Sequence, residues 1–127
     1  MTWYLDPKLK RCRRIVLRDI ARQVQIGAYD HERLASQPVI FNIEVFVTTS
    51  NEGDDITNAY NYDLIVEAVD QVIASGHIDL QETLIEAIAS TLLVHPAVHA
   101  VLVRSEKTQA YPNIRSAGIE IFREKND

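Results

Sequence analysis

Apolar side chains occupy every odd position from residue 39 to residue 47, the most regular pattern in this chain. The even positions between them are mixed, with the polar Asn42 and Glu44 beside the apolar Ile40 and Phe46. Successive side chains of a strand point to opposite faces, so this period of two predicts a strand with one buried face. Such a strand needs neighbouring strands beside it and a further layer to cover its apolar face.

Three other segments indicate strands. Residues 14–26 are rich in Ile and Val, and their alternation slips near Asp19, which predicts a β-bulge. Residues 98–103 and 118–122 indicate two more strands near the end of the chain. The sequence therefore predicts four strands, two before and two after its middle part.

The middle part has a helical spacing of apolar residues. One stretch begins near Asn61 and stops at Gly76, and a second runs from Asp79 to just before Pro96. The order strand, strand, helix, helix, strand, strand predicts an α+β fold, a four-stranded antiparallel sheet with both helices on one face. The other face and both sheet edges would stay exposed in a monomer, so we expect a homo-oligomer that closes several sheets into one larger barrel.

The composition limits the class of protein. A chain of 127 residues predicts one domain, here residues 14–127, preceded by an N-terminal arm at residues 1–13 whose basic run is expected to be solvated. The net charge of -5 argues against a nucleic-acid partner. No apolar run is long enough to span a membrane, and the single Cys12 suits a reducing compartment, so we expect a cytoplasmic protein.

Several kinds of chemistry lack a signature. The four glycines are not clustered, which disfavours a phosphate-binding loop. His95 and His99 are four residues apart, but Pro96 between them prevents a shared helical face. His31 and His77 have no partner at a spacing typical of metal ligands. We therefore expect neither a metal nor a cofactor.

Glu82 has two competing interpretations. With Asp79 three residues earlier, it fits a capping box, in which each side chain satisfies a backbone N–H at the helix start. A carboxylate in the first turn of a helix is equally suited to bind a planar ligand edge with two parallel N–H groups. The pattern alone leaves both interpretations open.

Four short motifs occur in register with the predicted elements: Ile26-Gly27-Ala28-Tyr29-Asp30-His31-Glu32 followed by Gln37, Asn61-Tyr62-Asp63, Leu80-Gln81-Glu82-Thr83-Leu84, and Glu106-Lys107 with Ala117-Gly118-Ile119-Glu120. In order and spacing they resemble the dihydroneopterin aldolases of folate biosynthesis, over roughly residues 14–123. The resemblance implies the tunnelling fold, with the element order given above. It also implies rings of four subunits that stack into octamers, with sites between subunits.

The resemblance implies a lyase that cleaves 7,8-dihydroneopterin by retro-aldol chemistry, with some epimerase activity through the same intermediate. The dihydropterin ring accepts the electrons, so neither a metal nor a Schiff base on Lys107 is required. One alternative is the epimerase of dihydroneopterin triphosphate, with Arg33 and Arg115 as groups for the phosphates. Another is a pterin-binding module without catalysis. Thr108 follows Lys107 where the family commonly has proline, Asn61 stands where it often has an acid, and the connection from Gly27 to Glu32 is shorter than in some members. Together these departures leave substrate preference open.

The resemblance also assigns roles to five residues of this sequence. Glu82 matches the residue that anchors the pterin, and Gln81 beside it is expected to bind substrate. Lys107 matches the catalytic lysine. Tyr62 matches a catalytic and substrate-binding tyrosine that the adjacent subunit supplies, and Glu32 matches a catalytic acid near the hydroxylated side chain of the substrate.

Overall fold

The computed structural model describes residues 2–125, and within them the strands and helices follow in the predicted order. These are β1 (Cys12–Val24), β2 (Gln37–Thr48), α1 (Asp63–Ile73), α2 (Gln81–Leu93), β3 (Val98–Lys107) and β4 (Ala117–Glu124). Short 3-10 helices lie at Trp3–Leu5, Leu9–Arg11, Asp30–Arg33 and Ile56–Asn58. The predicted ββααββ order is confirmed.

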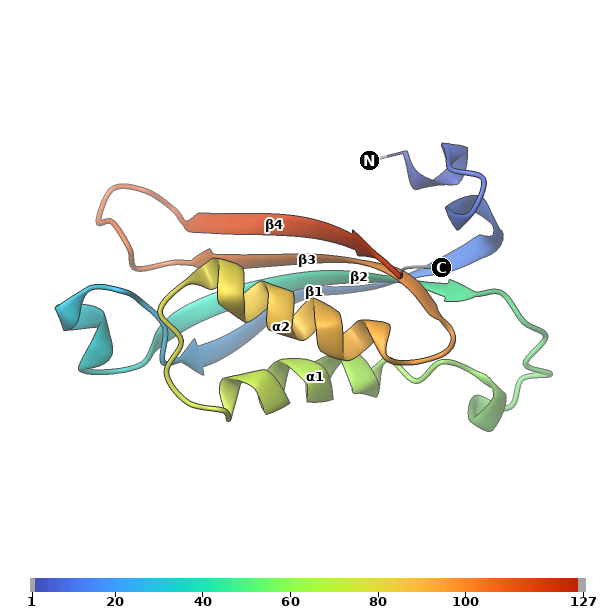
Figure 1. Cartoon of the computed structure of the whole chain (residues 1–127), viewed down its shortest axis with the longest axis horizontal. Helices are drawn as coiled ribbons and strands as arrows, with labels where there is room; N and C mark the ends of the chain where they lie inside the picture. The colour runs from blue at the N-terminus through green and yellow to red at the C-terminus, as the bar shows by residue number, and fades with distance from the viewer. Residues whose placement is uncertain (1, 126–127) are drawn as a thin grey trace.

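The four strands form one sheet in the order β1-β2-β3-β4, and each neighbouring pair is antiparallel. Figure 1 shows α1 and α2 side by side on one face of this sheet. The predicted bulge is also present, because the pairing of β1 with β2 shifts between Leu17 and Ile20. Asp19 has a φ of 57° at this point, and its N–H donates to Asn42 Oδ1 at 3.0 Å. The side chain of Asn42 thus satisfies a backbone group that the bulge removes from the ladder.

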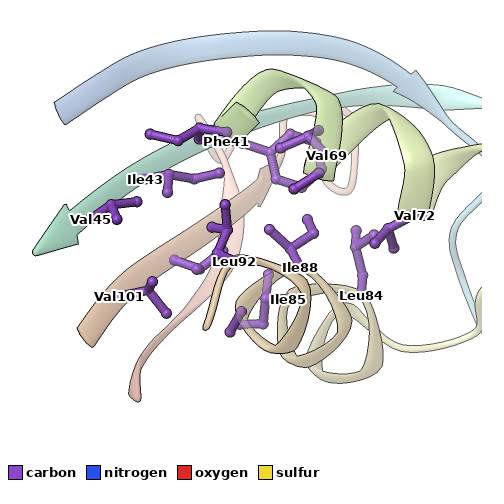
Figure 2. Packing of buried hydrophobic residues seen from close by; sticks show 14 of the residues in the cluster. Phe41, Ile43, Val45, Val69, Val72, Leu84, Ile85, Ile88, Leu92 and Val101 are labelled. Carbon is purple, nitrogen blue, oxygen red and sulfur yellow. The ribbon is translucent and has the colours of Figure 1, made fainter. Parts of the chain in front are cut away.

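The core lies between the sheet and the helices. The odd positions of β2 that gave the sequence its period of two are all buried there, from Val39 to Val47. Figure 2 shows side chains of β2 and β3 facing those of both helices, among them Phe41, Ile43, Val45, Val69, Val72, Leu84, Ile85, Ile88, Leu92 and Val101. This burial supplies the main favourable term in folding. No helix within residues 2–125 is long and apolar enough to cross a membrane.

The N-terminal residues pack on the opposite face of the sheet, away from the helices (Figure 1). A small apolar cluster forms there from Leu9, Cys12, Phe46 and Ala100, with Trp3 and Phe122 against it. The Trp3 ring lies 5.6 Å from the Phe46 ring in an edge-to-face arrangement. The expectation of a solvated arm is therefore wrong for Leu9, which is only 2% exposed. The arm packs because Phe46 and Ala100 face away from the helices and need an apolar cover.

The start of α2 differs from the predicted capping box. The helix begins at Gln81, its N-cap residue is Leu80, and no side chain caps it. Asp79 lies one residue before the N-cap, and its Oδ1 is 2.8 Å from Arg33 Nη2. The carboxylate of Asp79 is used by a distant residue rather than by the backbone of its own helix.

Candidate active site

Two loops that are far apart in the sequence meet at one end of the molecule. Figure 1 shows the loop between β1 and β2 and the loop between β3 and β4 at the same end, near the start of α2. Between them is a cleft of about 570 Å³. Its lining consists of Tyr29, His31, Glu32, Ala35, Ser36, Gln37, Gln81, Lys107, Gln109, Ala110, Tyr111 and Ala117.

A carboxylate and an ammonium group form an ion pair in the wall of this cleft. Lys107 Nζ donates to Glu32 Oε2 at 2.7 Å, although the two residues are 75 positions apart. Only 14% of the Lys107 side chain and 9% of the Glu32 side chain are exposed. Lys107 is the last residue of β3 and shares a face with the buried Val103, so its side chain points to the helix side, just beyond the apolar core. The structure thus brings two of the predicted catalytic residues together.

Further hydrogen bonds fix the Glu32 carboxylate. Gln37 Nε2 donates to Glu32 Oε2 at 2.9 Å and also to the carbonyl oxygen of Ile26 at 2.8 Å. The Tyr29 N–H donates to Glu32 Oε1 at 3.4 Å. Glu32 packs directly on Gly27, where a Cβ atom would lie 2.2 Å from Glu32 Cδ. Glycine at this position, with its φ of +136°, is what leaves space for the carboxylate.

The surroundings of Glu32 also set its protonation. Burial raises the pKa of the carboxyl, but hydrogen bonds from Lys107, Gln37 and the Tyr29 N–H outweigh burial and lower the pKa below its ordinary value. Glu32 is therefore a carboxylate near neutral pH, where it accepts hydrogen bonds. The ion pair in turn holds the flexible Lys107 side chain at the cleft wall.

Gln81, a predicted substrate-binding residue, lies in the same cleft with its side-chain amide already engaged. Its Oε1 accepts a hydrogen bond from Ser105 Oγ at 2.8 Å, and its Nε2 donates to the Ala117 carbonyl oxygen at 3.2 Å. These bonds join the start of α2 to β3 and β4. Ser105 is fully buried, and the bond to Gln81 satisfies its hydroxyl. On this face of β3, Ser105 follows the apolar Val101 and Val103. This change from apolar to polar in the sequence indicates that the apolar core ends here.

Glu82 and Tyr62 lie outside the group formed by Glu32, Lys107 and Gln81. Glu82 is exposed at the start of α2, forms no hydrogen bond or ion pair within residues 2–125, and is not among the described residues that line the cleft. Tyr62 is 60% exposed and directly precedes α1. Figure 1 shows the start of α1 at the opposite end of the sheet from the cleft. Their roles stay predictions.

The cleft also contains aromatic side chains for which no site role was predicted. The rings of Tyr29 and His31 stack, with centroids 6.0 Å apart and planes 5° from parallel. Tyr111 lines the cleft from the loop between β3 and β4 and is 55% exposed. The sequence signal that could have identified them is the presence of aromatic residues in connecting loops, where binding residues are common. Within the described part of the chain, no three His, Cys, Asp or Glu side chains are grouped closely enough to hold a metal ion.

The family model of dihydroneopterin aldolase matches residues 15–122 of this chain. The chain belongs to the dihydroneopterin aldolase family. A solved dihydroneopterin aldolase from Burkholderia thailandensis, bound to guanine, is 42% identical, and the match covers 97% of this chain and 99% of that chain with a TM-score of 0.88. The fold is thus the tunnelling fold of this family, and the resemblance seen in the sequence is confirmed.

Two curated relatives carry different names. A dihydroneopterin triphosphate 2'-epimerase from Pseudomonas aeruginosa is 26% identical over 92% of this chain and 94% of its own length. A dihydroneopterin aldolase from Streptomyces coelicolor is 29% identical over 76% of this chain and 83% of its own length. Both activities therefore occur among similar proteins.

Proposed function

We propose that the protein cleaves 7,8-dihydroneopterin into 6-hydroxymethyl-7,8-dihydropterin and glycolaldehyde, a lyase reaction of folate biosynthesis. The observation that carries the proposal is the Glu32–Lys107 ion pair in the cleft of a chain that matches the family over residues 15–122. The proposal places the reaction in the cytoplasm, which suits the free Cys12 thiol.

The reaction breaks the bond between the first and second carbons of the substrate side chain. The hydroxyl on the second carbon loses its proton, and its oxygen becomes the carbonyl oxygen of glycolaldehyde. The electron pair of the broken bond moves into the C=N bond of the dihydropterin ring, and the first carbon then takes up a proton to give the hydroxymethyl group. Because the ring is the electron sink, the proposed mechanism uses neither a metal nor a Schiff base.

In this mechanism Lys107 transfers protons at the substrate side chain. Its Nζ is held 2.7 Å from Glu32 Oε2, so the ammonium group has a fixed place in the cleft wall. Glu32 keeps its negative charge near neutral pH because its pKa is lowered, so its carboxylate can accept a hydrogen bond from a substrate hydroxyl. Proton transfer by a positioned side chain contributes roughly 100-fold to 10,000-fold in rate.

Glu82 is the proposed pterin anchor. The 2-amino-4-oxo edge of a pterin offers two adjacent N–H donors, which one carboxylate can accept in parallel. Glu82 is exposed and has no partner within residues 2–125, so both of its oxygens are available. Guanine, bound in the Burkholderia structure, has the same aminopyrimidinone edge. Gln81 is proposed to form the adjacent pocket wall, since Ser105 and Ala117 already engage its amide.

A complete site is proposed to form between subunits of a homo-oligomer, a tetramer or an octamer. Tyr62 supports this arrangement because it is exposed and directly precedes α1, which starts at the end of the sheet opposite the cleft, where a neighbouring copy could receive it. Mixing two inactive variants, Tyr62→Phe and Lys107→Ala, tests the idea. Shared sites would restore part of the activity in hybrid oligomers, whereas sites within one chain would leave the mixture inactive.

The triphosphate epimerase is a second candidate, supported by the 26% identity to the Pseudomonas protein. It needs cationic groups for the phosphates, and one of the two arginines considered for this role, Arg33, is paired with Asp79 at 2.8 Å. Arg115 lies in the loop between β3 and β4 and remains a candidate. Rates on dihydroneopterin and on its triphosphate discriminate between the two functions, and we expect the unphosphorylated substrate to be cleaved faster.

The test of the main proposal is turnover of 7,8-dihydroneopterin by the assembled protein. Lys107→Ala should abolish turnover and keep pterin binding, measured by calorimetry. A wild-type protein that binds pterin and yields no product would instead be a binding module. Borohydride reduction during turnover should trap no covalent adduct, and a trapped adduct on Lys107 would contradict the mechanism without a Schiff base.

A further inference from the structure

Two side chains of the linker between α1 and α2 contact the loop that carries Glu32. His77 Nε2 lies 2.8 Å from the Gly27 carbonyl oxygen and 3.3 Å from Asp79 Oδ1. The same Asp79 Oδ1 lies 2.8 Å from Arg33 Nη2. We name His77, Asp79 and Arg33 the linker clasp.

The linker clasp holds the Glu32 loop on both sides of the carboxylate. Before Glu32, both backbone polar groups of Gly27 are engaged, because its N–H donates to the Ile78 carbonyl oxygen at 3.0 Å and its C=O faces His77. After Glu32, the next residue is Arg33, which is bound to Asp79. The Glu32 side chain rests directly on Gly27, so a shift of the Gly27 backbone toward it would displace the carboxylate.

The chemistry of these contacts defines the state of His77. A carbonyl oxygen only accepts hydrogen bonds, so the Nε2 atom must carry the hydrogen that faces Gly27. Asp79 Oδ1 lies 3.3 Å from the same nitrogen, as its charged neighbour. The side chains of Arg33 and Asp79 are 47% and 51% exposed, and ion pairs at such exposure contribute little to stability. The value of the linker clasp therefore lies in geometry rather than in stability.

We propose that the linker clasp positions Glu32: His77 fixes the Gly27 carbonyl and Asp79 fixes Arg33, so that the Glu32 carboxylate stays against Lys107. His77 and Asp79 are positioning residues, since they act on the cleft through the loop. The effect on catalysis rests on the proposed function, whereas the effect on the Glu32 carboxylate does not. The two can be measured separately.

The first measurement follows Glu32 itself, through the carbon-13 shift of its carboxyl group in a pH titration of the full chain. His77→Leu removes the N–H donor, whereas His77→Gln keeps an N–H donor at similar reach. We expect the pKa of Glu32 to rise toward its ordinary value in His77→Leu and to stay low in His77→Gln. Arg22→Leu is the control, because it breaks an exposed ion pair with Asp70 elsewhere on the surface, and it should leave the Glu32 titration unchanged.

The second measurement is turnover of 7,8-dihydroneopterin. His77→Leu should lower kcat about tenfold, since small misplacements of a catalytic group slow the reaction. KM should change less than about twofold, because the proposed pterin anchor Glu82 is untouched. His77→Gln should restore most of kcat. A merely structural role would lower the melting temperature of both variants and would not produce rescue by Gln.

The two measurements decide separately on the positioning role of the linker clasp and on the proposed function. An unchanged Glu32 titration in His77→Leu overturns the positioning role, as does an equal shift in both His77 variants. A Glu32 shift in a protein whose wild type has no turnover supports the linker clasp and removes the proposed function. If His77→Leu fails to fold, Asp79→Asn provides the same comparison, because it removes the charge that holds Arg33 and should shift the Glu32 titration in the same direction.

Discussion

Replacing Gly27 by Ala is expected to displace Glu32 from Lys107. The added Cβ would lie 2.2 Å from Glu32 Cδ and 2.3 Å from Glu32 Cβ, whereas non-bonded carbon atoms need about 3.5–4.0 Å. The Glu32 side chain must therefore move by more than about 1 Å. After such a movement the 2.7 Å hydrogen bond from Lys107 Nζ cannot persist.

The expected sizes of the effects follow from this displacement. A misplacement of about 1 Å can cost about 100-fold in rate, so kcat for dihydroneopterin cleavage should fall by about that factor. The φ of +136° at Gly27 adds backbone strain of about 1–3 kcal/mol. At roughly 4 °C per kcal/mol for a chain of this size, Tm should fall by about 4–12 °C. Steady-state kinetics and thermal unfolding followed by circular dichroism measure the two effects.

Gly53→Ala is the matched control. Gly53 also has a positive φ, +60°, but a Cβ there would meet no atom within 4 Å. It lies in the loop between β2 and α1, at the other end of the sheet from the cleft. We expect a small loss of Tm and wild-type kcat. The reasoning is refuted if Gly27→Ala also keeps wild-type kcat, because Glu32 would then not need its place on Gly27.

Three further predictions concern other residues. Glu82→Gln should raise the Kd for a pterin by about 10–100-fold in calorimetry. It should change Tm by no more than about 4 °C, since Glu82 has no partner within residues 2–125. A fall in Tm with unchanged Kd would leave Glu82 with a helix-start role only. The pKa of Glu32 is lower in the folded protein than in the unfolded chain, where it is about 4.3. The ionised Glu32 carboxylate therefore stabilises the fold fully above the unfolded-state pKa, and this stabilisation is lost as the pH falls through the folded-state pKa. Urea unfolding at neutral and acidic pH should therefore show a larger loss of unfolding free energy in the wild type than in Glu32→Gln, and equal losses would contradict the ion pair. Leu9→Ala should lower the unfolding free energy by about 2–5 kcal/mol because Leu9 is 2% exposed, and no loss would show that the arm does not pack on the sheet.

The parts of the fold that were predictable from the sequence are those with a local period. β2 was predicted because one face of it is buried along its length, so that apolar residues must alternate. The slip in alternation at Asp19 predicted a bulge, because an extra residue inverts the pattern of every residue after it. The helices followed from their apolar faces, although α1 begins at Asp63, two residues after Asn61, and α2 begins at Gln81, one residue later than an N-cap at Asp79 predicts.

The parts that were not predictable depend on contacts between distant segments. Asp79 fits a helix cap by local pattern, yet its carboxylate pairs with Arg33 and lies beside His77 instead. The meeting of Glu32 with Lys107 joins residues 75 positions apart, and no local period contains that information. Only the family resemblance indicated that both belong to one site. The apolar residues of the N-terminal arm stand among charged residues in the sequence, so they gave no apolar pattern. They are buried only because the arm packs on the sheet face away from the helices.

Product analysis with 7,8-dihydroneopterin tests the central claim most directly. The assembled wild-type protein should release 6-hydroxymethyl-7,8-dihydropterin and glycolaldehyde in equal amounts, measured by chromatography of the pterin and derivatisation of the aldehyde. Lys107→Ala should bind a pterin and release neither product. Wild-type protein that binds a pterin and still forms no product, or a Lys107→Ala variant with wild-type turnover, would contradict the account.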